Sequence, residues 1–60
     1  MTINAGKLRG GMHLAFENVY VRVEEVVAGT HGMITAFVKD AAGRRAPVRF
    51  HSDELLTVGA

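Results

Sequence analysis

The clearest strand pattern in this sequence runs from Val19 to Val27, which reads VYVRVEEVV. Its first six residues alternate between valine and a larger aromatic or charged residue, and this period of two is typical of a strand. The valines therefore face one side, and Tyr20, Arg22 and Glu24 face the other. The pair Glu24-Glu25 breaks the alternation, so we expect a β-bulge there that restores an apolar inner face.

Outward from this stretch, the same alternation predicts four more strands, at residues 12–16, 33–39, 45–51 and 56–58. Residues that favour turns separate these strands. Glu17-Asn18 predicts a tight turn, because asparagine tolerates a positive φ. Residues 28–32 form a loop with two glycines, and residues 40–43 form a hairpin connection with Gly43 in a left-handed conformation.

Two features shape the C-terminal part of the chain. Pro47 cannot donate to a β-ladder, so its strand lies at a sheet edge or Pro47 faces the open side of that strand. Residues 52–55 predict one helical turn, because Ser52 can cap it and the acidic Asp53 and Glu54 suit its positive end.

This order of elements predicts an all-β fold, a small five-stranded SH3-like barrel with one short helical turn before the last strand. Such a barrel buries one core with few exposed edges. We expect residues 1–60 to form this single domain, with residues 1–10 as a lead-in segment whose Leu8 caps one end of the core. The rival interpretation is an open sheet that a second copy completes. The predicted core consists of Met12, Leu14, Phe16, Val19, Val21, Val23, Ile34, Ala36, Val38, Val48, Phe50, Leu56 and Val58.

Length and composition narrow the possible functions. Sixty residues support one small domain, and the absence of cysteine excludes disulfides and thiolate zinc sites. The net charge of +1 gives little overall attraction to nucleic acids or membranes. No apolar run approaches the ~20 residues that span a bilayer. A signal-peptide pattern is also missing, so we expect a cytoplasmic protein without a membrane partner.

Motifs that carry chemistry are missing from the sequence. It contains no nucleophile elbow, no phosphate-binding glycine loop and no nucleotide fingerprint. His13, His31 and His51 are far apart and lack the short paired spacing of metal ligands, although His13 and His51 both face outward and could approach each other across the sheet. The sequence therefore predicts a protein without enzymatic activity, cofactor or metal.

The predicted outer face carries aromatic and basic side chains together. The candidate binding residues are Tyr20, Arg22, Phe37, Lys39, Arg44, Arg45 and Arg49. We expect this face to bind another protein or a copy of the chain itself, because apolar patches with tyrosine and arginine are typical of such interfaces. The alternative is RNA or DNA, whose bases stack on aromatic rings while phosphates contact arginine and lysine. A third interpretation places Phe37 in the core through a shifted register.

Several segments also resemble the N-terminal KOW-like barrel of elongation factor P and its relatives. They are residues 11–14 (GMHL), residues 19–26 (VYVRVEEV), the loop of residues 29–32 (GTHG), the basic hairpin of residues 40–45 and the strand of residues 48–52. The resemblance implies a small barrel and contact with RNA. In that family the glycine loop carries a modified lysine, whereas Thr30 and His31 occupy the loop here, so the resemblance does not extend to the activity of that factor.

Overall fold

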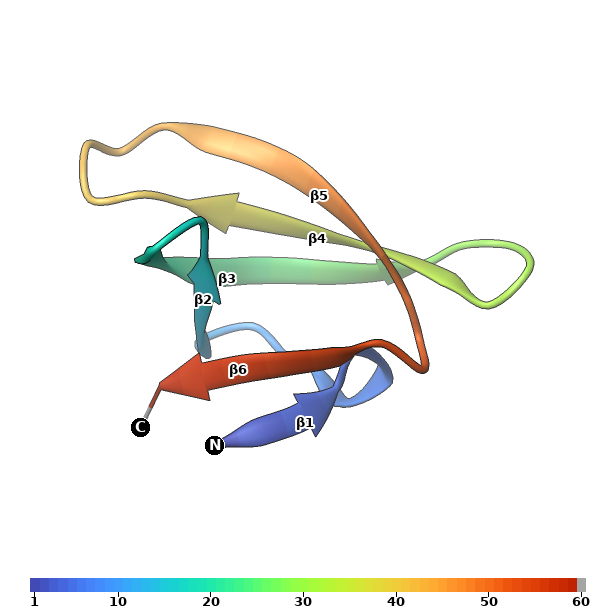
Figure 1. The fold of residues 1–60 in the computed structure, drawn as a ribbon. Helices are drawn as coiled ribbons and strands as arrows, with labels where there is room; N and C mark the ends of the chain where they lie inside the picture. The colour runs from blue at the N-terminus through green and yellow to red at the C-terminus, as the bar shows by residue number, and fades with distance from the viewer. Residues whose placement is uncertain (60) are drawn as a thin grey trace.

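The computed structural model of the chain describes residues 1–59, which form an almost entirely β structure (Figure 1). Six strands and one short 3-10 helix follow one another along the chain. They are β1 (Thr2–Asn4), η1 (Ala5–Lys7), β2 (His13–Phe16), β3 (Val19–Ala28), β4 (Met33–Lys39), β5 (Arg45–His51) and β6 (Leu55–Gly59). The strands form one antiparallel sheet in the order β1-β6-β2-β3-β4-β5.

The sheet curls strongly but does not close, because its two edge strands, β1 and β5, share no ladder. Instead, one end of the curl is held by main-chain hydrogen bonds between segments far apart in sequence. The Gly6 N–H donates to the Ser52 carbonyl at 2.9 Å, and the Ser52 N–H donates to the Gly32 carbonyl at 2.8 Å. These bonds connect η1, the β5–β6 turn and the β3–β4 loop, whereas the other end of the curl stays open.

The turns follow the predicted chemistry. Glu17 and Asn18 both have positive φ, 50° and 68°, which are the signs of a type I′ hairpin turn between β2 and β3. Gly43 has a φ of 84° in the β4–β5 hairpin. The register of β3 against β4 shifts between Val23 and Glu25, which confirms the predicted bulge.

The core lies on the concave side of the curled sheet. Its buried members are Ala5, Leu8, Leu14, Val21, Val23, Ile34, Ala36, Val38, Phe50, Leu56 and Val58. Every second residue faces inward along β4 and along β3 on each side of its bulge, so the predicted alternation is confirmed for these strands. Met12, Phe16 and Val48, all predicted core residues, are only partly buried and pack against this cluster.

Val19 is the one predicted core residue that the structure leaves largely exposed, at 56%. It has the inward direction that the alternation requires, because it lines the concave side together with Val21 and Val38. The prediction of burial was wrong because the open end of the sheet has no strand to cover this position.

The strand count and the helical turn also differ from expectation. The structure has six strands rather than five, because Thr2–Asn4, in the predicted lead-in segment, pairs with β6. Residues 52–55 form a hydrogen-bonded turn and the start of β6 instead of a helical turn; the Glu54 N–H donates to the His51 carbonyl at 2.9 Å. The Ser52 N–H donates to the Gly32 carbonyl, and the Ser52 carbonyl accepts from the Gly6 N–H. Ser52 thus pairs with two other segments instead of capping a helix. No helix among residues 1–59 is long and apolar enough to cross a membrane.

Replacing Leu14, which is 1% exposed, by alanine should lower the free energy of unfolding by about 2 to 5 kcal/mol, because it leaves a cavity in the core. Leu55→Ala is the matched control: this side chain is 68% exposed, and its loss should change stability by less than about 0.5 kcal/mol. Urea denaturation of both variants measures the difference. Equal losses would contradict the inner and outer assignment of these strands.

Candidate functional site

Four strands present a row of basic side chains on the convex outer face of the sheet. The register places His13 of β2 opposite Arg22 of β3, Arg22 opposite Lys39 of β4, and Lys39 opposite Arg45 of β5. Directly opposite residues share a face of a sheet. We call these four residues the basic row. Because neighbouring strands lie about 4.8 Å apart, the row spans about 14 Å.

Acidic side chains border the basic row at the bulge of β3. Glu24 Oε1 lies 3.0 Å from Arg45 Nε, in an ion pair whose arginine side chain is 71% exposed. Glu25 lies opposite Phe37, and Phe37 lies opposite Pro47. Glu24, Glu25, Phe37 and Arg45 together line a hollow of about 360 Å³. The bulge thus brings two carboxylates beside one end of the row.

The aromatic side chains lie on either side of the basic row. Tyr20 lies opposite Ala15, two residues before Arg22 on the same face of β3, and is 57% exposed. Phe37 lies two residues before Lys39 on the same face of β4, on the other side of the row from Tyr20. It is 42% exposed, so the interpretation that placed Phe37 in the core is wrong. Because the row separates Tyr20 from Phe37, the outer face holds two aromatic positions with cations between them instead of one continuous apolar patch.

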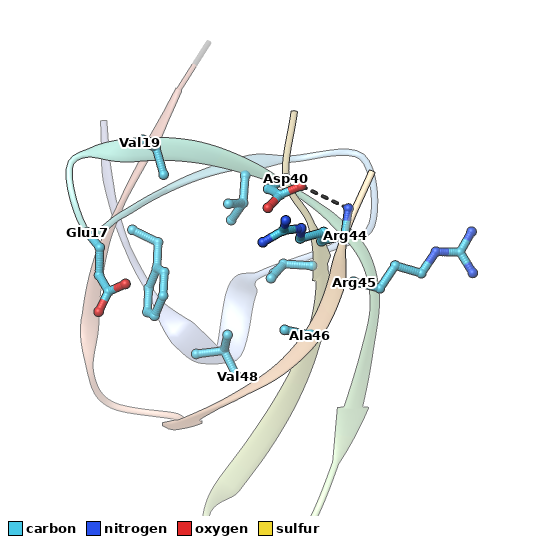
Figure 2. Close-up of a pocket in the computed structure, with 10 residues that line it drawn as sticks. Glu17, Val19, Asp40, Arg44, Arg45, Ala46 and Val48 are labelled. Carbon is cyan, nitrogen blue, oxygen red and sulfur yellow. Dashed lines mark hydrogen bonds between the residues drawn. The ribbon is translucent and has the colours of Figure 1, made fainter. Parts of the chain in front are cut away.

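The two remaining candidate residues, Arg49 and Arg44, lie apart from this arrangement. Arg49 lies on the outer face opposite Thr35, two positions farther along β5 than Pro47. The Arg44 side chain points to the concave side, whereas that of its neighbour Arg45 points away from it (Figure 2). The structure therefore brings Tyr20, Arg22, Phe37, Lys39 and Arg45 together, leaves Arg49 at one side and separates Arg44.

His13 and Glu24 were not among the predicted site residues. The alternation already indicated that both face outward, but their position in the site depends on which strands neighbour β2 and β3. That neighbourhood is a property of the sheet order rather than of either strand alone.

A pocket of about 400 Å³ opens on the concave side, at the open end of the sheet (Figure 2). We call it the mouth. Its apolar lining consists of Phe16, Val19, Val21, Val38, Ala46 and Val48. Glu17, Asp40, Arg44 and Arg45 are the charged residues of its lining. Residues of the β2–β3 turn and of β5 thus face the same space without a ladder between their strands.

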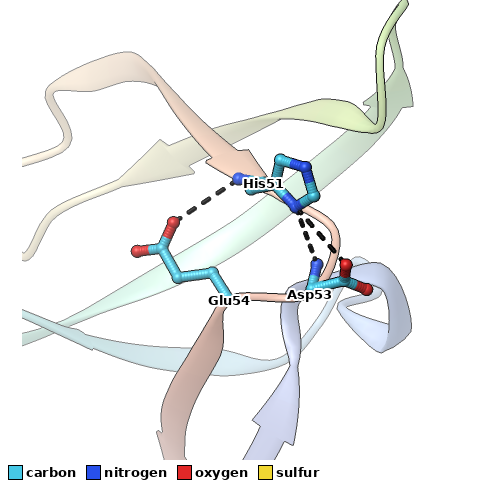
Figure 3. A network of polar contacts seen from close by, with 3 residues as sticks. All are labelled: His51, Asp53 and Glu54. Atoms are coloured by element: carbon cyan, nitrogen blue, oxygen red, sulfur yellow. Dashed lines mark hydrogen bonds and ion pairs between the residues drawn. The ribbon is translucent and has the colours of Figure 1, made fainter.

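The histidines do not converge. His13 lies in the basic row, whereas His51 lies at the far end of β5, opposite Met33. His51 organises the β5–β6 turn (Figure 3): its Nδ1 accepts a hydrogen bond from the Asp53 N–H at 3.3 Å, and its own N–H donates to Glu54 Oε1 at 3.4 Å. Residues 1–59 contain no group of three histidine or acidic side chains that could hold a metal ion.

Comparison with known proteins adds no relative: we find no matching family model, no matching curated protein and no matching solved structure.

The hairpin that carries Arg44 and Arg45 depends on one carboxylate. Asp40 Oδ1 accepts hydrogen bonds from the N–H groups of Ala42 and Arg44, both at 2.9 Å. Asp40→Ala should therefore lower the free energy of unfolding by about 1 kcal/mol. Asp40→Asn keeps an oxygen acceptor at this position and should retain most of that stability. Urea denaturation compares the two variants, and equal losses would show that the carboxylate oxygen does not hold the hairpin.

Proposed function

We propose that this protein is a non-enzymatic binding module whose outer face binds a short stretch of single-stranded nucleic acid. The observation that carries the proposal is the basic row, with Tyr20 on one side and Phe37 on the other. Phosphates would contact Arg22, Lys39 and Arg45, and bases would stack on the two rings. Small barrels bind single strands with this combination of cations and stacking platforms.

The energetics of the sheet support a ligand for this row. Like charges directly opposite each other destabilise an antiparallel sheet, so Arg22, Lys39 and Arg45 in one row do not serve its stability. Glu24 pairs with Arg45 only; no carboxylate of residues 1–59 lies within 4.0 Å of the Arg22 or Lys39 side-chain nitrogens. A phosphate backbone would supply the missing negative charge.

Replacing Lys39 by glutamine should weaken the binding of a fluorescent single-stranded oligonucleotide several-fold and reduce the slope of log K against log salt by about 0.7, the amount expected for one lost phosphate contact. Lys7→Gln is the matched control, because Lys7 lies in η1, outside the row. Fluorescence anisotropy across a salt series measures both quantities. Absence of binding by the unmodified protein at low salt, or equal effects of the two substitutions, would overturn the proposal.

A protein partner, another protein or a copy of the chain, is the second candidate for the same face. The observation in its favour is that the face carries both signs of charge. Glu24 and Glu25 lie beside the basic row, and Phe37 lies between Glu25 and β5. Mixed charges around an aromatic side chain are typical of protein interfaces, in which arginine and aromatic residues are enriched. Single-stranded nucleic acid would gain nothing from the two carboxylates.

Phe37→Glu tests the second candidate. If the outer face holds two copies together, this substitution should convert an associated species to monomer in sedimentation equilibrium, because it places a charge in the centre of the contact. Thr35→Glu, on the same face of β4 but one position farther from the row, is the control for added charge. An unchanged mass for Phe37→Glu would exclude this face as the contact between copies.

We further infer that the curled sheet is a variant of the SH3-like barrel, open at one end. Short antiparallel strands, a long bent strand with a bulge and closure by main-chain hydrogen bonds at one end support this relationship. The likeness to the barrel of elongation factor P adds the suggestion of RNA as the nucleic acid.

A further inference from the structure

We propose that the mouth is covered by a second copy of this chain, which seats its own mouth against it. The inference concerns the concave side and is independent of the ligand of the outer face. Two features of the mouth support it: an apolar lining that the fold leaves uncovered, and charges of opposite sign on its two sides.

The mouth exposes side chains that belong to the core by their direction. Val19 is 56% exposed although it faces inward, and Phe16 and Val48 are covered only in part. Covering the mouth would remove apolar area from water, which is favourable at roughly 25 cal/mol per Å².

The charges beside the mouth are complementary to a copy of themselves. Glu17, in the β2–β3 turn, lies on one side of the mouth, and Arg44, just before β5, lies on the other beside Asp40 (Figure 2). Neither side chain has an ion-pair partner within 4.0 Å among residues 1–59. A two-fold axis that crosses the mouth between them would place each Arg44 opposite Glu17 of the other copy. This is the self-complementary arrangement that a symmetric dimer requires.

Two copies would meet through the side chains of the mouth and not by pairing the free edges of their β5 strands. Pro47 removes one donor from the free edge of β5, and Arg45 and Arg49 add charge to that edge, two features that hinder edge-to-edge pairing of strands. Ten residues line the mouth, fewer than the roughly 20 to 30 residues that each side of a stable interface contributes. We therefore expect a weak dimer that forms at high protein concentration.

The first experiment compares two valines of β3. Val19→Gln places an amide in the mouth and should raise the dimer dissociation constant about tenfold or more, because the amide loses water there without gaining a partner. Val27→Gln is the matched control: Val27 is 43% exposed, lies on the outer face, and its replacement should leave association unchanged. Sedimentation equilibrium up to a concentration on the order of 1 mM measures both constants, with circular dichroism to verify folding.

The second experiment exchanges the charges. Glu17→Arg and Arg44→Glu should each weaken association, and the double variant should restore it, because only a copy of the chain carries the reciprocal charge. A strictly monomeric unmodified protein, equal effects of the two valine substitutions, or no recovery in the double variant would overturn the proposal. Oligonucleotide binding by Val19→Gln should stay intact, so the two proposals fail separately. Dissociation by Phe37→Glu but not by Val19→Gln would instead assign the contact to the outer face.

Discussion

The apolar contact between the inner faces of β3 and β4 holds the curled sheet together. Val21 and Val23 face inward beside Ala36 and Val38, and all four are buried. A chain of sixty residues without disulfides has few other sources of stability, so this apolar contact and its extension to β2, β5 and β6 must offset the conformational entropy of the whole sheet. The bulge at Glu24 lets a strand of ten residues bend around this core without turning its apolar side to water.

The two ends of the curled sheet differ because different forces act there. At one end, the N–H groups of Ala5, Gly6 and Ser52 bond to carbonyl groups of distant segments, so that η1, the β5–β6 turn and the β3–β4 loop hold one another. At the other end, the β2–β3 turn and the start of β5 share no hydrogen bond, and apolar side chains face an open pocket. The same fold thus has a convex face that carries the basic row and a concave apolar opening at the other end.

The outer face shows how register aligns side chains from separate strands. Arg22, Lys39 and Arg45 belong to three strands, and each is an ordinary exposed residue of its own strand. Only antiparallel pairing aligns them, and this alignment opposes the stability of the sheet because the three charges repel. Glu24 reduces that cost at one end of the row through its ion pair with Arg45. The remaining uncompensated charge is the observation on which the proposed function of this face rests.

The residue pattern was sufficient to place five of the six strands, to assign which of their residues point inward, and to locate the turns. These properties depend on the local backbone. Alternation follows from the period of a strand, and a positive φ is tolerated by asparagine at position 18 and by Gly43, which has no Cβ. Tertiary structure alone decided that Val19 lies in water, that residues 2–4 add a sixth strand, that residues 52–55 form a turn instead of a helix, and that Arg44 leaves the outer face. Each of these outcomes depends on which distant segment supplies a hydrogen bond or covers a side chain, and local periodicity contains no information about that neighbour.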